Sequence, residues 1–150
     1  MELRSTFQSI ISLHQRELPL DLQDRKMQLP LDGGCIVTVT GIRRCGKSSL
    51  LGLTINRLLE AGVPKERILY VGFDDERFLS MAPDNFDELL QAYREMYPTT
   101  SLQDVYMFFD EIQLVSGWEL FVLRVYKNYC KHIFITGSTE IGRASCRERV

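Results

Sequence analysis

The feature that most constrains this chain is a glycine-bounded loop between an apolar run and a helix. Residues 41–49 have the sequence GIRRCGKSS and follow the apolar run CIVTVT at 35–40. They match the pattern G-x-x-x-x-G-K-[ST] at its fixed positions, Gly41, Gly46, Lys47 and Ser48. The glycines let the backbone turn tightly, so that successive amide groups point at phosphate oxygens at the start of the helix. The stretch is therefore predicted to be a phosphate-binding loop.

The loop side chains have separate expected roles. Lys47 brings a mobile charge to the outer phosphates for binding and catalysis, and the Ser48 hydroxyl is an expected Mg²⁺ ligand. The residues expected to bind the phosphates are Gly41, Ile42, Arg43, Arg44, Cys45, Gly46, Lys47, Ser48 and Ser49. For the two arginines two interpretations stay open: they assist the phosphates or contact a neighbouring subunit, or they are simply solvated.

Apolar periodicity around the loop predicts an α/β fold. Residues 35–40 favour a strand, and apolar residues recur at helical spacing from Lys47 to a stop at Gly62. Further apolar runs favour strands at 68–73, 105–109 and 132–136. Because these runs do not alternate polar with apolar residues, helices are expected to cover both faces of the sheet. We predict a three-layer α/β/α sandwich of the P-loop NTPase type, with a mostly parallel sheet.

Helical stripes occupy the segments around these strands. The stripes are Leu51, Ile55, Leu58 and Leu59, then Phe86, Leu89, Leu90 and Tyr93, and then Trp118, Phe121, Val122 and Val125. Ser116 and Glu119 have the spacing of a capping box for the last stripe. The same spacing, at Ser5 and Gln8, precedes an N-terminal stripe of Phe7, Ile10, Ile11, His14 and Leu18. A connector is expected from Pro19 to Gly34.

Composition narrows the class of protein. A chain of 150 residues that is 45 % apolar supports one domain with a core. It has no stretch long enough to cross a membrane and no signal-peptide pattern, so the cytoplasm is the expected compartment. The four cysteines lack paired metal spacing and are interpreted as reduced thiols. A net charge of −2 gives no electrostatic indication of nucleic-acid binding.

A second chemical signal closes the third apolar run, in VYMFFDEIQ at 105–113. Asp110 is expected to hold Mg²⁺, and Glu111 is expected to accept a proton from an attacking water, the Walker B arrangement. An isolated Asp-Glu pair more often caps a strand at the surface, but a position downstream of a phosphate loop favours the functional interpretation. The presence of Glu111 favours hydrolysis over phosphate transfer.

Other polar residues near the strand ends have competing interpretations. The fourth run ends in TGS, so Thr136 or Ser138 could reach the γ-phosphate or the attacking water, although this is also ordinary turn chemistry. The acidic run 74–76 is expected to form a polar turn rather than approach the site. His14 is interpreted as a core or boundary residue, and His132 as a strand residue without a metal partner.

Four motifs in order, GIRRCGKSSLL, ILYVGFDDERF, FFDEIQLVSGWE and IFITGS, resemble the prokaryotic AAA-type ATPases that carry a C-terminal domain of poorly defined function. The resemblance spans most of residues 1–139. It implies phosphate binding by 41–49, metal binding by Ser48 and Asp110, catalysis by Glu111 and nucleotide sensing near Ser138. It also implies a five-stranded sheet in which the Asp110 strand is not directly beside the first strand. Only four strands are evident in the sequence, which leaves the first strand at an open edge.

The final segment, EIGRASCRERV at 140–150, departs from the resemblance where another helix should begin. It matches an in-frame translation of a common sequencing-library adapter, and we interpret it as read-through; the alternative is a natural basic tail. The expected division is an N-terminal helix and connector at 1–34, a truncated ATPase core at 35–139 and a non-native tail at 140–150. Such a fragment is expected to bind Mg²⁺–ATP but to turn it over slowly.

Three functions therefore remain in consideration. The favoured one is ATP binding and Mg²⁺-dependent hydrolysis, coupled to an unknown output through a homo-oligomer or a protein partner that binds the missing C-terminal region. An ATP-gated interaction switch with little turnover is the second. A helicase-like motor core is the third, because DEIQ resembles the DExx box, but a second motor domain and a basic channel are not visible.

Overall fold

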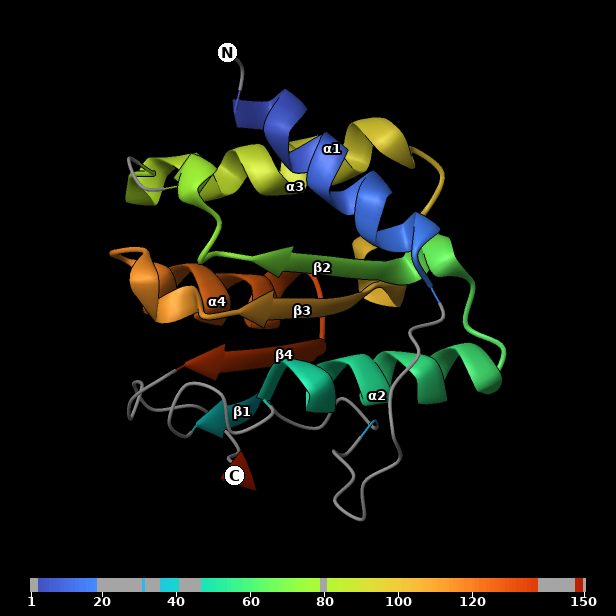
Figure 1. Ribbon diagram of the computed structural model, residues 1–150. Helices are drawn as coiled ribbons and strands as arrows, with labels where there is room; N and C mark the ends of the chain where they lie inside the picture. Colours follow the sequence, from blue (N-terminus) through green and yellow to red (C-terminus); the bar gives the residue numbers. More distant parts are fainter. Residues whose placement is uncertain are drawn as a thin grey trace.

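A parallel five-stranded sheet forms the centre of the molecule (Figure 1). The computed structural model describes residues 3–18, 31, 36–40, 47–78, 81–137 and 148–149. The strands are β1 (Val37–Thr40), β2 (Ile68–Gly72), β3 (Tyr106–Asp110), β4 (His132–Gly137) and β5 (Glu148–Arg149). Their order is β2-β3-β4-β1-β5, and every pairing is parallel. The predicted α/β fold is confirmed, as is the separation of β3 from β1 by one strand.

Helices pack on both sides of this sheet (Figure 1). They are α1 (Leu3–Arg16), α2 (Lys47–Glu60), α3 (Phe86–Met96) and α4 (Trp118–Asn128). Short 3₁₀ turns lie at Lys65–Arg67, Glu76–Phe78, Pro83–Asn85, Leu102–Asp104 and Ile112–Leu114. Within the described residues, no helix is both long enough and apolar enough to span a bilayer.

Alternate residues of each strand enter different apolar clusters, which explains why the runs are apolar throughout. Leu69 and Val71 of β2 belong to a cluster with α3 and α4. Ile68 of β2 belongs to a second cluster, with α2. Since successive side chains of a strand point to opposite faces, both faces of the sheet are buried and both demand apolar side chains. The predicted stripes of α3 and α4 are buried in full.

The β2 edge of the sheet is covered by α1, which also packs on α3 (Figure 1). Phe7 and Ile11 are fully buried there. The Gln15 side-chain amide donates a hydrogen bond of 3.0 Å to the carbonyl of Ile68 in β2. Because an edge strand presents unpaired backbone groups, this contact satisfies one of them from the helix.

The opposite edge differs from the sequence-based expectation. Two residues of β5 pair with Val39 and Thr40 of β1, so the expectation of four strands with β1 at an open edge is wrong. The physical reason is that main-chain groups, rather than side chains, make a strand pairing, so a short aperiodic segment can supply one.

Two of the predicted helix starts are also wrong. The residue at the N-cap of α4 is Gly117, with φ 82°, and no side chain caps the helix there. The first helix begins at Leu3, which places Ser5 inside it. The Gln8 amide instead donates to the carbonyl of Ala92 in α3, at 3.3 Å. Neither predicted capping box is therefore formed, and at Gln8 a contact with α3 takes its place.

The predicted end of α2 at Gly62 is confirmed. Gly62 has φ 101°, a conformation that favours glycine. Its amide donates to the carbonyl of Leu59, and the amide of Val63 donates to that of Leu58, at 3.1 and 3.0 Å. This pair of bonds is a Schellman motif, which satisfies the last carbonyls of the helix.

The two left-handed glycines provide a matched test of packing. An added Cβ at Gly117 would lie 2.9 Å from Cβ of Pro83, whereas one at Gly62 would meet nothing within 4 Å. Gly117→Ala is expected to lower the free energy of unfolding by about 2 to 5 kcal/mol, because steric overlap adds to backbone strain. Gly62→Ala is expected to cost about 1 to 2 kcal/mol, from backbone strain alone. Urea unfolding of both variants measures the difference, and equal losses would contradict the assigned contact with Pro83.

Candidate functional site

The predicted phosphate loop occupies the connection from β1 to α2. Strand β1 ends at Thr40 and α2 begins at Lys47, so the strand and the helix that the motif requires are both present. Residues 41–46 and Ser138 lie outside the described residues, as do the side chains of Lys47 and Ser48. Ser49 is half-buried in the first turn of α2. The positive end of this helix therefore faces the loop.

The carboxyl ends of the strands bring the acidic pair to the same edge of the sheet. Thr40 pairs with Gly137 at the end of β4, and Gly72 pairs with Asp110 at the end of β3. Since all the strands run in parallel, the residues that follow β1, β3 and β4 emerge together. The structure thus brings Asp110 and Glu111 to the edge from which the loop leaves.

Two hydroxyl groups hold the Asp110 carboxylate. The Thr136 hydroxyl donates to Oδ1 at 2.5 Å, and the Tyr70 hydroxyl donates to Oδ2 at 2.5 Å. Only 4 % of Asp110 is exposed. Hydrogen bonds to both oxygens fix the plane of the carboxylate, so Asp110 is oriented rather than merely located at the end of β3.

Glu111 has a strained backbone that several contacts maintain. Its φ is 55° and its ψ is 41°, in the left-handed region, which costs a residue other than glycine about 1 to 3 kcal/mol. Its amide donates to the Thr136 hydroxyl at 2.9 Å, and its carbonyl accepts from the amide of Leu114 at 3.2 Å. The side-chain amide of Gln113 donates to Oε1 at 2.9 Å. Strain that is held in this way is typical of functional positions.

Thr136, one of the two candidates left open at this strand end, lies between the two acidic residues. Its hydroxyl donates to Asp110 and accepts from the Glu111 amide, and the residue is fully buried. The structure therefore uses Thr136 to connect the two acidic residues, instead of directing it towards a phosphate. The other candidate at this strand end, Ser138, lies outside the described residues.

The donor atoms at this edge fit Mg²⁺. Asp110 supplies carboxylate oxygens of fixed orientation, and Ser48 is the first hydroxyl residue inside α2. Mg²⁺ prefers oxygen ligands, and in nucleotide sites it usually has one or two protein ligands and several waters. The oxygen chemistry of Asp110 is therefore compatible with Mg²⁺.

On its outer side, Tyr70 is covered by α1. The rings of His14 and Tyr70 stack at 4.4 Å with an interplanar angle of 11°. Burial lowers the pKa of His14 to about 4, so the imidazole is neutral at pH 7. The boundary position predicted for His14 is thus confirmed.

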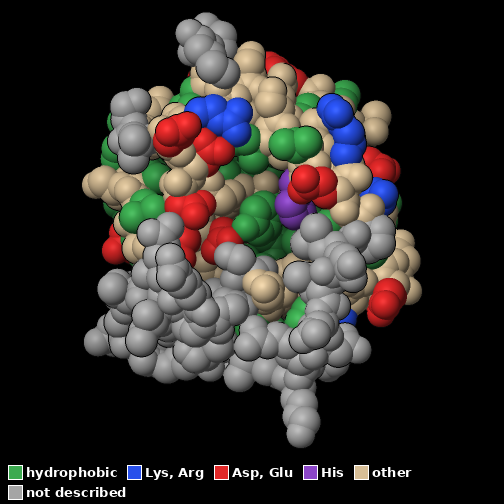
Figure 2. Space-filling view, viewed as in Figure 1, with side chains coloured by type: hydrophobic (Ala, Val, Ile, Leu, Met, Phe, Trp, Pro, Cys, Tyr) green, Lys and Arg blue, Asp and Glu red, His purple; other side chains and the backbone are tan. Residues whose placement is uncertain are grey.

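A cavity of about 400 Å³ opens next to this stack. It is lined by residues of α1 and of the β2 end, including Leu13, His14, Tyr70, Asp74 and Arg77. On this face a histidine lies between acidic and hydrophobic side chains (Figure 2). The predicted polar turn is confirmed, because Asp75 accepts a hydrogen bond of 2.9 Å from the Arg77 amide and pairs with the guanidinium at 2.9 Å.

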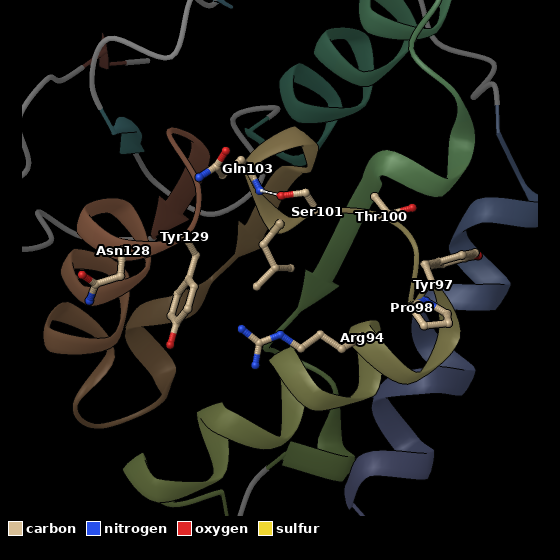
Figure 3. Close-up of a pocket in the computed structure, with 9 residues that line it drawn as sticks. Arg94, Tyr97, Pro98, Thr100, Ser101, Gln103, Asn128 and Tyr129 are labelled. Atoms are coloured by element: carbon tan, nitrogen blue, oxygen red, sulfur yellow. Dashed lines mark hydrogen bonds between the residues drawn. The ribbon is translucent and has the colours of Figure 1, made fainter.

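A second cavity, of about 440 Å³, lies at the other end of the sheet (Figure 3). It is lined by the ends of α3 and α4 and the 3₁₀ turn before β3, with Arg94 pointing towards Tyr129. The guanidinium carbon of Arg94 lies 5.3 Å from the centre of that ring. None of the residues predicted for the functional site lines this cavity.

Sequence reasoning missed two residues that contact the acidic pair. Gln113 follows Glu111 by two positions, and its place in DEIQ was the available signal. Tyr70 gave no such signal, because it lies 40 residues before Asp110 and the pairing of β2 with β3 brings them together.

Comparison with known proteins places the chain in a family. A family model described as an AAA domain matches residues 34–147. An uncharacterized protein of Methanocaldococcus jannaschii is 35 % identical over 116 residues, which are 77 % of this chain and 24 % of that protein. One of Haemophilus influenzae is 36 % identical over 109 residues, 71 % of this chain and 26 % of that protein. The solved structure of C. elegans PCH-2 matches with a TM-score of 0.46 and 14 % identity, over 99 % of this chain and 41 % of that one.

These matches also show how long the related proteins are. The chain spans about a quarter of the length of the curated relatives. The matched family region contains the β1–α2 loop and the acidic pair that follows β3. The resemblance to AAA-type ATPases is confirmed, and the chain belongs to the family of AAA domains, which are nucleotide-binding ATPase domains.

Proposed function

We propose that this chain is the core of an ATPase that binds Mg²⁺–ATP and hydrolyses it to ADP and phosphate. The observation that carries the proposal is the oriented acidic pair at the edge of the sheet from which the β1–α2 loop leaves. Asp110 is held by two hydroxyls, and Glu111 is held by Gln113 and by its own backbone contacts. A strand end that served only as a surface cap would not need a buried carboxylate fixed at both oxygens.

Each residue then has a definite role. The amides of 41–46, with Lys47, bind the phosphates, and Ser48 with Asp110 holds the metal. Bound Mg²⁺ neutralises charge on the β- and γ-phosphates. A carboxylate oxygen of Glu111 accepts the proton of the attacking water, and Gln113 orients that carboxylate. The roles of the loop residues, and the role of Ser138 in nucleotide sensing, are inferred from the sequence.

Charge stabilisation in the transition state commonly requires an arginine, supplied in cis or in trans. We propose that a second copy or the remaining length of the protein supplies it, since the relatives are about four times as long as the matched region. The chain alone is then expected to bind nucleotide better than it hydrolyses it. Its coupling to an output through an oligomer or a protein partner belongs to this same proposal.

Replacing Lys47 by Ala tests the nucleotide site directly. ATP affinity is expected to fall by at least about 10-fold, because a charge-assisted contact to phosphate contributes about 1.5 to 3 kcal/mol. Calorimetric titration measures the affinity, and circular dichroism verifies the fold. Lys65→Ala is the matched control, because Lys65 is exposed in the turn before β2, at the other end of the sheet.

The outcomes separate the candidate functions. Unchanged ATP affinity in folded Lys47→Ala protein would contradict the proposed site. Tight ATP retention with very slow turnover by the full-length protein, together with ATP-dependent capture of a partner, would favour the nucleotide-gated switch. Stimulation of turnover by single-stranded DNA or RNA would favour the helicase-like motor.

A further inference from the structure

We propose that Tyr70 is a positioning residue for Asp110, and that α1 keeps it in position through His14. The inference rests on the proposed function, because it concerns the metal ligand of the nucleotide site. It goes beyond that function in one respect: α1 affects the affinity of the site for nucleotide-bound Mg²⁺.

The strand register explains how Tyr70 reaches the acidic residue. Tyr70 pairs with Phe108, and Gly72 pairs with Asp110, so the phenol extends along the sheet by two register positions to bond Oδ2. Gly72 lies beside the phenol, since an added Cβ there would be 3.8 Å from the Tyr70 hydroxyl, in ordinary van der Waals contact.

The ring of Tyr70 is fixed from two sides. It packs against the apolar cluster of α2, and it stacks on His14 of α1 at 4.4 Å. A stacked ring with an 11° interplanar angle has little freedom to tilt without displacing its neighbour. The hydroxyl is consequently held at the position of the Asp110 oxygen.

Anchors next to His14 hold α1 on the sheet. Gln15 donates to the Ile68 carbonyl at 3.0 Å and accepts from the Tyr97 hydroxyl at 2.5 Å. One residue of α1 thus bonds both the edge strand and the end of α3. Because His14 is adjacent to this anchor, its ring has a defined place relative to β2.

Outer-shell hydrogen bonds of this kind orient metal ligands, and their loss typically reduces metal affinity or activity by about 10- to 100-fold. Without the Tyr70 hydroxyl, Asp110 loses the bond to Oδ2 and keeps the Thr136 bond to Oδ1, so Oδ2 is less constrained. The expected consequence is weaker metal binding with nucleotide contacts unchanged. A role in packing alone would instead weaken the whole fold.

The test compares nucleotide affinity in Mg²⁺ with affinity in EDTA, using ADP and ATP titrated into the purified chain. Tyr70→Phe removes only the hydroxyl. It is expected to lower the ratio of nucleotide affinity in Mg²⁺ to nucleotide affinity in EDTA by about 10-fold, while the affinity in EDTA stays within about twofold of the parent value. The matched control is Tyr106→Phe, because Tyr106 also stacks on a histidine, His132, at 4.3 Å, but lies at the far end of β3 from Asp110. Thermal melting accompanies each titration.

Variants at His14 test the part played by α1. His14→Ala is expected to weaken the Mg²⁺ effect in the same direction by a smaller factor, because the Tyr70 ring loses its stacking partner. His14→Phe restores a flat ring without titratable nitrogens and is expected to recover the parent value. Recovery by the conservative variant distinguishes ring placement from a chemical role for imidazole.

A Tyr70→Phe variant with the Mg²⁺ effect of the parent would overturn the inference, and so would equal losses in Mg²⁺ and in EDTA. A His14→Ala variant identical to the parent would overturn the part that concerns α1. If the parent itself binds nucleotide no better than Lys47→Ala, the proposed function fails first, and the two failures are thereby distinguished.

Discussion

Glu111→Gln is expected to leave Mg²⁺–ATP bound while slowing its hydrolysis by about 10²-fold or more. The replacement amide can still accept the hydrogen bond from Gln113 through its oxygen, so the side chain is expected to stay in place. It cannot accept a proton from water at neutral pH, which removes the proposed general base. Steady-state phosphate release by the full-length protein and nucleotide titration measure the two effects separately.

The control for this variant is Glu119→Gln, since Glu119 is exposed in the first turn of α4. It makes the same chemical change on a neighbouring element and is expected to leave hydrolysis unchanged. Hydrolysis at the parent rate by Glu111→Gln would mean that another residue is the base. The strained backbone at 111 would then need a different explanation.

Asp110→Ala is expected to abolish most of the Mg²⁺-dependent gain in ATP affinity and to destabilise the fold. Removal of the carboxylate takes away the proposed metal ligand and also the acceptor of the Tyr70 and Thr136 hydroxyls. Each donor that is left unsatisfied in a buried place costs about 1 to 3 kcal/mol. Nucleotide titrations in Mg²⁺ and in EDTA measure the first effect, and urea unfolding measures the second.

Asp104→Ala serves as the control, because Asp104 is an exposed acidic residue in the turn before β3. It lies at the opposite end of the strand from Asp110, so neither nucleotide affinity nor stability is expected to change by much. If Asp110→Ala kept the full Mg²⁺ effect, the metal assignment would be wrong. If it kept parent stability, the two hydroxyl bonds to Asp110 would contribute little to the free energy of unfolding.

Much of the fold was predictable because burial on both faces leaves a simple signature. The apolar runs at 68–73 and 132–136 correspond to β2 and β4, with ends shifted by a residue. The wrong predictions were those that relied on local sequence spacing alone. A capping box at Ser116 was a reasonable prediction from spacing, but the N-cap is Gly117, which has a left-handed backbone and lies close to Pro83, 34 positions earlier.

The site shows the same division between local and long-range information. Asp110 and Glu111 were predictable because they follow a buried strand downstream of the loop. The role of Tyr70 was not, since it depends on which residue of β2 pairs with which residue of β3, and one step of register would direct it elsewhere. Thr136 was one of two candidates left open at the end of its strand, and its hydroxyl partners required the structure.

The placement of α1 has a consequence for how the protein is made. Its contacts join residues far apart in the chain. Gln15 bonds to Ile68, 53 positions later in the sequence, and Arg4 bonds to Glu95, 91 positions later. On a ribosome that adds about 5 to 20 residues per second, roughly 5 to 20 seconds pass between the synthesis of Arg4 and that of Glu95. A 14-residue helix is marginal by itself, so the apolar side chains of Phe7 and Ile11 emerge long before their partners exist. Helix α1 can therefore dock only after the segment that contains α3 has been synthesised, and its apolar side chains stay exposed until then.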